Sequence, residues 1–173
     1  MERRSVWIGF WLFFVIAGAL YMTMVLVTLP QLLVGPDNLR PFDARPFGYT
    51  PEAARAYLAG LSEAARATYL GLQHRLDAFF PAANALWMGC AVVLAFAGRV
   101  RFGLIAAIGV FTLCDYLENA AVSGMLSAGP AGPGDDEITR ASLFTLGKSM
   151  GTTIVWISLI FGGVTNWLRR RRG

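Results

Sequence analysis

The chain has 173 residues, of which 55% are hydrophobic and only 15% charged, with a mean hydropathy of +0.52. A soluble domain of this length carries more charge than that. The formal net charge of +4 comes from short basic flanks of apolar segments and not from a groove-sized basic face, which excludes a nucleic-acid-binding protein.

Four apolar blocks follow one another along the chain, and each is long enough to cross the ~30 Å hydrocarbon layer as a helix. They cover residues 6–33, 76–97, 102–126 and 142–168. The sequence therefore predicts an all-α protein, a four-transmembrane-helix bundle in which residues 1–173 form a single integral membrane domain. The first block is longer than the apolar region of a cleavable signal, which is about 7–15 residues, so we expect an uncleaved anchor.

Basic residues flank these blocks unevenly. Arg3, Arg4, Arg99, Arg101 and the arginine run at 169–172 all fall on one side of a four-span protein. The two loops on the other side offset their arginines with acidic residues. An excess of Lys and Arg marks cytoplasmic segments, so we expect a multi-pass protein of the cell inner membrane with both termini in the cytoplasm.

Residues 34–75 form the longest segment that the sequence places outside the spans. Thr50 followed by Pro51 is typical of a helix start, with an N-cap and then proline at the first helical position. Ser62 and Glu63 start a second helix, which we expect to run unbroken into the second span. The sequence thus predicts a short helical hairpin that lies over the outer mouth of the bundle.

The two cysteines, Cys90 and Cys114, both lie inside predicted spans. The chain has no CxxC motif and only one histidine, so we expect no metal site and no cofactor. Both cysteines are predicted to be small core residues. Their similar depth leaves a redox pair between neighbouring helices open as an alternative.

Charged and amide side chains occur in the middle of the third span, where an ionised group costs about 2.5–3.5 kcal/mol. Asp115, Glu118 and Asn119 share one helix face at positions i, i+3 and i+4. Polar residues also share a face in the second span (Asp77 and Asn84) and in the fourth (Thr145, Lys148, Ser149 and Thr152). We expect the three faces to point at one another and away from lipid.

Lys148 is the only cation inside the predicted spans, and two carboxylates in a low dielectric do not both ionise without a counter-charge. We expect one carboxylate to pair with Lys148 and the other to be protonated or hydrogen-bonded to Asn119. Pro81 removes the helical donor for the carbonyl of Asp77 and leaves a free acceptor there. The predicted ligand-binding residues are Asp115, Glu118, Asn119, Lys148, Asp77, His74, Asn84, Tyr21 and Thr152, and the catalytic candidates are Asp115, Glu118 and Asp77.

These residues leave several functions open. The preferred prediction is a protein that binds a membrane lipid or amphiphilic small molecule in an outer-leaflet polar pocket, or an accessory membrane subunit. A membrane enzyme that uses intramembrane carboxylates for acid/base chemistry on a lipidic substrate is a second reading. A proton-coupled transporter is a third, and it requires a homo-oligomer, because the inner halves of the spans are apolar. Membership of a larger membrane complex and a purely structural salt bridge stay open as well.

Three short elements resemble an uncharacterised family of small bacterial four-span integral membrane proteins. They are GYTPEAARAYL at 48–58, LDAFFP at 76–81 and DYLEN at 115–119. The resemblance implies a helical inner-membrane protein and brings no established activity. It adds weight to one set of residues, Asp77, Pro81, Asp115, Glu118 and Asn119. The vitamin K epoxide reductase and claudin families share the four-span plan, but their cysteine signatures are absent here.

Overall fold

The computed structural model describes the backbone of residues 3–130 and 132–172, and the side chains as far as residue 165. Within these ranges the chain is almost entirely helical, and its only strand-like pairing is one isolated bridge between Val34 and Leu39. The predicted all-α four-helix bundle is therefore confirmed. Four helices are long and apolar enough to cross a membrane: Arg3–Leu32, Glu63–Ala95, Gly98–Ala128 and Asp135–Thr165.

The first long helix is α1 (Arg3–Thr23), which continues through a π-helical turn, η1 (Met24–Thr28), into α2 (Leu29–Leu32). The wider turn lies just before Pro30, which has no backbone N–H to continue the regular ladder. The helix ends at Leu33, where the backbone becomes extended.

The second long helix begins well before the predicted span. It consists of α4 (Glu63–Thr68), a π-helical turn η3 (Tyr69–Gln73) and α5 (His74–Ala95), without a break. The Ser62 hydroxyl accepts a hydrogen bond from the Ala65 N–H and caps its start. The expected continuity from the loop into the second span is confirmed.

The remaining long helices are α6 (Gly98–Ala128) and α7 (Asp135–Arg172). The short helix α3 (Pro51–Gly60) precedes α4, and the Thr50 hydroxyl caps it as predicted. The second long helix begins before the predicted 76–97 and ends at Ala95, whereas the third and fourth extend beyond the predicted 102–126 and 142–168 at both ends. The reason is that hydropathy marks only the apolar middle of a helix and not its polar end turns.

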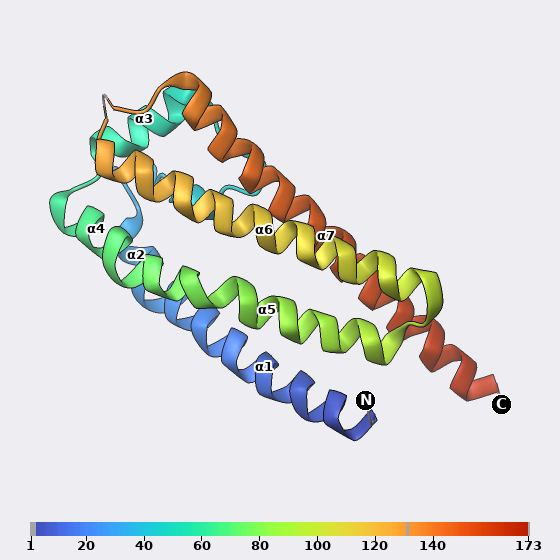
Figure 1. The fold of residues 1–173 in the computed structure, drawn as a ribbon. Coiled ribbons are helices and arrows are strands. Elements are labelled where there is room, and N and C mark those ends of the chain that lie inside the picture. Colours follow the sequence, from blue (N-terminus) through green and yellow to red (C-terminus); the bar gives the residue numbers. More distant parts are fainter. Residues whose placement is uncertain (1–2, 131, 173) are drawn as a thin grey trace.

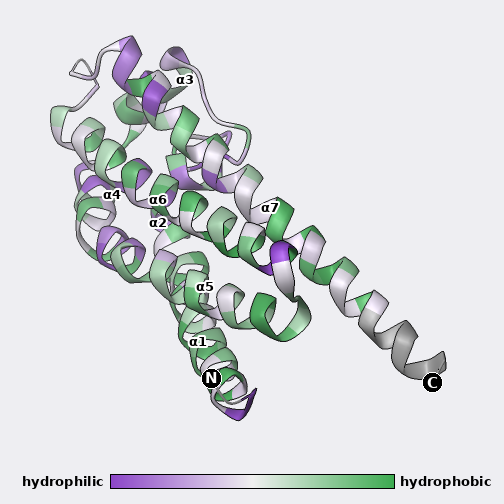
Figure 2. Cartoon of the chain, turned by 45° about the vertical axis from the view of Figure 1, so that its right-hand side comes forward, coloured by the Kyte–Doolittle hydropathy of each residue, from purple (hydrophilic) through white to green (hydrophobic). Residues whose placement is uncertain are grey.

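The long helices lie side by side, with α1 packed on α5, α5 on α6 and α6 on α7 (Figure 1). The start of α1, the end of α7 and the α5–α6 turn lie at one end, called here the terminal end. Residues 33–62, 129–130 and 132–134 lie at the other, called here the loop end. Hydrophilic segments gather at the loop end, whereas the lengths of the long helices are mostly hydrophobic (Figure 2).

Two apolar cores stabilise the bundle. One fills the loop end, where Phe42, Tyr57 and Leu58 are fully buried against α6 and α7. The other lies in the half of the bundle nearer the terminal end and consists of Trp87, Met88, Val92, Leu104, Ile108, Phe111 and Val155. The polar side chains of the spans lie between these two cores.

The sequence predicted a loop that only covers the mouth of the bundle, but part of the loop enters the bundle. Its turn η2 (Phe42–Ala44) inserts between the long helices, and Phe42 is 0% exposed. The Phe42 N–H donates a hydrogen bond to the Tyr69 hydroxyl oxygen at 3.1 Å, and the Tyr57 hydroxyl donates to the Leu32 carbonyl at 2.8 Å. These bonds fix an irregular segment inside the helix bundle, where its own backbone has few partners.

Candidate functional site

Lys148 on α7 holds two carboxylates of α6. Its Nζ lies 3.0 Å from Asp115 Oδ1 and also forms an ion pair with Glu118 Oε2. Glu118 is 0% exposed, and its other carboxylate oxygen accepts a 2.5 Å hydrogen bond from the Thr145 hydroxyl. The expectation that only one carboxylate pairs with Lys148 is wrong. The spacing of Asp115 and Glu118 by less than one turn lets a single ammonium group reach both.

Asn119 binds a different partner from the one expected. Its amide Nδ2 donates to the backbone carbonyl of Asp77 at 3.0 Å. This is the acceptor that Pro81 leaves free, because proline at the fourth following position has no N–H to donate. Asn119 therefore joins α6 to the proline site of α5, and the predicted bond from Asn119 to a neighbouring carboxylate is wrong.

Asp43 brings a fourth carboxylate into the cluster from the loop turn η2. Tyr69 donates its hydroxyl to Asp43 Oδ1, and Gln73 Nε2 donates to Asp43 Oδ2 at 3.2 Å. The same Gln73 nitrogen donates to Asp77 Oδ2 at 2.8 Å, and Gln73 Oε1 accepts from the Thr28 hydroxyl. The Gln73 amide thus bridges two carboxylates, one from the loop and one from α5.

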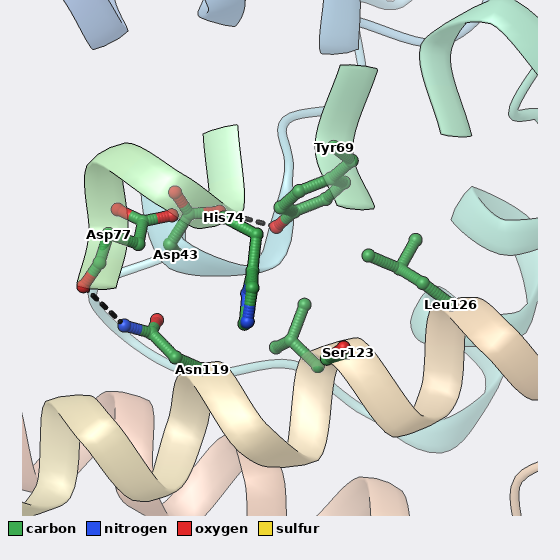
Figure 3. Close-up of a pocket in the computed structure, with 8 residues that line it drawn as sticks. Asp43, Tyr69, His74, Asp77, Asn119, Ser123 and Leu126 are labelled. Atoms are coloured by element: carbon green, nitrogen blue, oxygen red, sulfur yellow. Dashed lines mark hydrogen bonds between the residues drawn. The ribbon is translucent and has the colours of Figure 1, made fainter. Parts of the chain in front are cut away.

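His74 lies on the loop-end side of this cluster. Its side chain extends towards α6 beside Asn119 and Ser123, with Asp43 and Asp77 nearby (Figure 3). These residues line a cavity of ≈ 10 Å³. That volume holds about one water molecule and excludes any organic ligand.

A larger cavity of ≈ 220 Å³ lies on the other side of Asp43 and Asp77. Its polar lining consists of these two carboxylates with Gln73, Asp115 and Lys148, and its apolar lining comes mainly from η1 and α2. We call it the acidic cavity. Of the charged and amide groups in the cluster, only Glu118 and Asn119 do not line it.

The acidic cavity continues into a groove of ≈ 610 Å³ between α1 and α7, called here the lateral groove. The two hollows share the lining residues Tyr21, Asp43, Phe80, Asp115 and Lys148. Beyond these, the groove is lined by Phe14, Ala17 and Gly18 on α1, by Asn84 and Trp87 on α5, and by Ser149, Thr152, Thr153 and Trp156 on α7. Tyr21 is 49% and Trp156 43% exposed, so the groove opens sideways along the apolar length of the helices.

Aromatic rings form the part of the groove nearest the terminal end. The Trp87 ring lies 5.5 Å from the Phe14 ring and 5.2 Å from the Trp156 ring, measured between centroids. Trp87 is only 9% exposed, and its indole N–H is buried without an acceptor among the described residues. A buried donor without a partner is costly, unless something outside the chain accepts its hydrogen bond.

The predicted site residues divide into two groups. Those that line the acidic cavity or the lateral groove are Tyr21, Asp77, Asn84, Asp115, Lys148 and Thr152. Glu118, Asn119 and His74 lie outside both: Glu118 is buried behind Lys148, Asn119 ties α6 to α5, and His74 faces the small cavity. Cys90 contacts the Gly9 position and Cys114 the Gly147 position, and both are free thiols, so they belong to different helix interfaces.

Sequence reasoning missed Asp43 and Gln73. Asp43 lies in a loop segment without helical or strand periodicity, and Gln73 carries no charge that would mark it as unusual. The one available signal was the aromatic and arginine content around Asp43. The Arg45 guanidinium lies 5.2–5.8 Å from the ring centroids of Phe42, Tyr49 and Tyr57 and anchors this turn.

Burial changes the acid–base behaviour of this loop. It lowers the pKa of Arg45 and raises the pKa values of Tyr49 and Tyr57 above the ordinary tyrosine range. The nearby carboxylate of Asp43 raises the pKa of Tyr57 further. Removing charge-stabilising water therefore favours the neutral phenols in the folded loop.

Among the described residues, no three His, Cys, Asp or Glu side chains come together as the ligands of a metal ion would. The geometry instead offers a charged polar head region that is joined to an apolar, laterally open groove. Searches against protein-family models, curated proteins and solved structures found no match to the chain.

Proposed function

We propose that this chain is a multi-pass inner-membrane protein that binds a lipid or other amphiphile in the lateral groove. The proposal rests on one observation: a groove of ≈ 610 Å³ runs from the Asp115–Lys148 pair to the Phe14, Trp87 and Trp156 rings. A molecule with a polar head and an apolar tail matches this gradient. Ligand sites of this size are typically apolar, with a few polar groups that fix orientation.

The opening of the groove supports a ligand that enters from the membrane. It lies between α1 and α7, and both helices carry exposed apolar side chains along their length. With both termini in the cytoplasm, as the arginine flanks indicate, the acidic cavity is in the outer half of the membrane. Two of the three elements with the family resemblance line this cavity, LDAFFP through Asp77 and Phe80 and DYLEN through Asp115, which suits a shared binding role.

The transporter alternative receives less support. The core formed by Trp87, Met88, Val92, Leu104, Ile108, Phe111 and Val155 fills the bundle on the terminal-end side of the cluster. The small cavity, the acidic cavity and the lateral groove do not continue the row of polar side chains through this core. The enzyme alternative receives less support from His74 and Glu118. His74 lines only the cavity of ≈ 10 Å³, which is too small for a lipidic substrate, and Glu118 lines neither the acidic cavity nor the lateral groove.

The test is native mass spectrometry of the protein released from mild detergent after purification from its own membranes. Gly18 lines the groove, and a Cβ at this position meets no atom within 4 Å, so Gly18→Leu fills the groove without a clash. Gly109 on α6 has equally open space but does not line the groove, so Gly109→Leu is the matched control. We expect a co-purifying amphiphile with the wild type and Gly109→Leu, and its loss in Gly18→Leu. Equal occupancy in all three proteins would refute the groove as the binding site.

A further inference from the structure

The acidic cavity has more negative than positive groups. Asp43, Asp77 and Asp115 line it together with a single cation, Lys148. Lys148 is already engaged by Asp115 and by the buried Glu118. No ion pair to Asp43 or Asp77 occurs among the described residues, and their recorded side-chain partners are the neutral groups of Gln73 and Tyr69.

Neutral donors only partly compensate two carboxylates in a low dielectric. Arg45, two residues after Asp43, stacks on aromatic rings, and its guanidinium donates to the Arg40 carbonyl at 2.8 Å. Two like charges bridged by one amide repel each other unless a proton or a cation enters. The ≈ 220 Å³ of free space beside them is large enough for a small cationic group.

The walls of the cavity favour an organic cation. Its other lining residues include Met24, Val25, Leu29 and Leu32, which offer no oxygen ligands for a metal ion. At its junction with the groove, the Tyr21 and Phe80 rings lie 6.1 Å apart between centroids. Aromatic faces attract ammonium groups.

The buried indole N–H of Trp87 is an independent sign of a ligand. Trp87 lines the groove, and its indole N–H has no acceptor among the described residues. Trp87 is ten residues after Asp77 on α5, about 15 Å along the helix axis. A ligand that satisfies both positions carries a positive head and, further along, a hydrogen-bond acceptor such as an ester or phosphate oxygen.

We propose that the lateral groove selects amphiphiles with a primary ammonium head, which the acidic cavity binds between Asp43 and Asp77, while the apolar tail lies along Trp87. This inference rests on the proposed function, because it specifies the ligand of the same groove. Two sources share this chemistry, a simple long-chain amine and a phospholipid with an ethanolamine head. Only the phospholipid carries an acceptor for the Trp87 N–H.

The experiment compares probes with the same alkyl chain and different heads on the wild-type protein in mild detergent. Hexadecylamine, hexadecanol and hexadecanoate are titrated separately, and bound fractions are read by native mass spectrometry. We expect the amine to bind at least about tenfold more tightly than the alcohol, because it gains charge-assisted hydrogen bonds. We expect the carboxylate to bind most weakly, because the acidic cavity repels it.

Variants then locate the head. Asp43→Asn/Asp77→Asn should lose the preference for the amine and keep its affinity for the alcohol, whereas Asp37→Asn, an exposed carboxylate in the loop, serves as the matched control. Trp87→Phe should weaken a dipalmitoyl phospholipid with an ethanolamine head by about fivefold and leave hexadecylamine unchanged.

The outcomes separate this inference from the proposed function. Equal binding of amine and alcohol to the wild type overturns the ammonium preference and leaves an amphiphile groove in place. Binding of no probe by the wild type, together with unchanged occupancy in Gly18→Leu, overturns both. The comparison of hexadecylamine, hexadecanol and hexadecanoate uses only the wild-type protein, so it tests the ammonium preference even if the aspartate variants fail to fold.

Discussion

Removing the ammonium group of Lys148 is the sharpest test of the charge cluster. Lys148→Met keeps a flexible, unbranched side chain of similar length and removes the only cation in contact with Asp115 and Glu118 among the described residues. The 3.0 Å pair with Asp115 alone corresponds to an attraction of about 5–6 kcal/mol at an effective dielectric of about 20. Much of this is offset by the cost of burying the charges, and breaking a buried pair costs about 3–5 kcal/mol net.

The lower end of that range is the expected value for this bundle. Helices that separate within a membrane find new polar partners, which reduces the loss. We therefore expect Lys148→Met to lower the free energy of unfolding by about 3 kcal/mol. The measurement is reversible unfolding in mixed detergent micelles, followed by circular dichroism. Because Lys148 is the only lysine in the chain, loss of amine labelling confirms the substitution.

A compensated variant provides the control. Lys148→Met/Asp115→Asn/Glu118→Gln removes all three charges, and the amide at position 118 still accepts the hydrogen bond from Thr145. We expect this triple variant to recover most of the lost stability, since it leaves no uncompensated charge at positions 115, 118 and 148. The reasoning is refuted if Lys148→Met unfolds within about 0.5 kcal/mol of the wild type, or if the triple variant is as unstable as the single one.

Three further predictions follow from individual contacts. Asn119→Ala should lower the free energy of unfolding by about 1 kcal/mol. The loss should be smaller in a Pro81→Ala background, where the backbone N–H of residue 81 can donate to the Asp77 carbonyl, and a double-mutant cycle measures the difference. Gly151→Ala should cost about 1–3 kcal/mol, because its Cβ would lie 2.6 Å from a side-chain carbon on α6, whereas Gly163→Ala meets open space and should cost nothing measurable in the same unfolding assay. Burial raises the pKa of Tyr57, so the neutral phenol stabilises the folded state below pH ~10, and this stabilisation is lost as the pH rises through the folded-state pKa. The free energy of unfolding should therefore fall between pH 8 and 11, and Tyr57→Phe should reduce this fall.

The helices and the central pairing were predictable because both follow from local rules. Apolar length gives the spans, and the spacing of Asp115 and Glu118 by three residues puts both on one face of α6. A lone lysine on α7 at a matching depth is then their nearest counter-charge. The residue spacing could not show whether Lys148 binds one of these carboxylates or both, since an ammonium group can do either. The sequence showed a free donor, the Asn119 amide, and a free acceptor, the Asp77 carbonyl left by Pro81. That the two form a hydrogen bond depends on the packing of α5 against α6, which the sequence does not show.

The loop contribution was not predictable from pattern. Asp43 enters the bundle because Phe42 fills a space between helices and because Tyr69 binds the Phe42 backbone, while Tyr57 binds the Leu32 carbonyl at the end of α2. Each of these contacts joins residues at least 25 positions apart, so no local period records them. Gln73 is similar, because its role exists only once η2 places Asp43 beside Asp77.

The insertion of this loop also explains why the cluster is unbalanced. Within the spans alone, Asp115 and Glu118 share Lys148, and Asp77 is the one carboxylate without a cation. The loop adds Asp43 beside it instead of an arginine, although Arg45 is only two residues away and stacks on aromatic rings. A structural salt bridge would place an arginine beside Asp77, because a second half-buried carboxylate raises the electrostatic free energy of the folded state. An excess of negative charge next to an open groove is costly for stability in the empty protein, and a bound cation would relieve it.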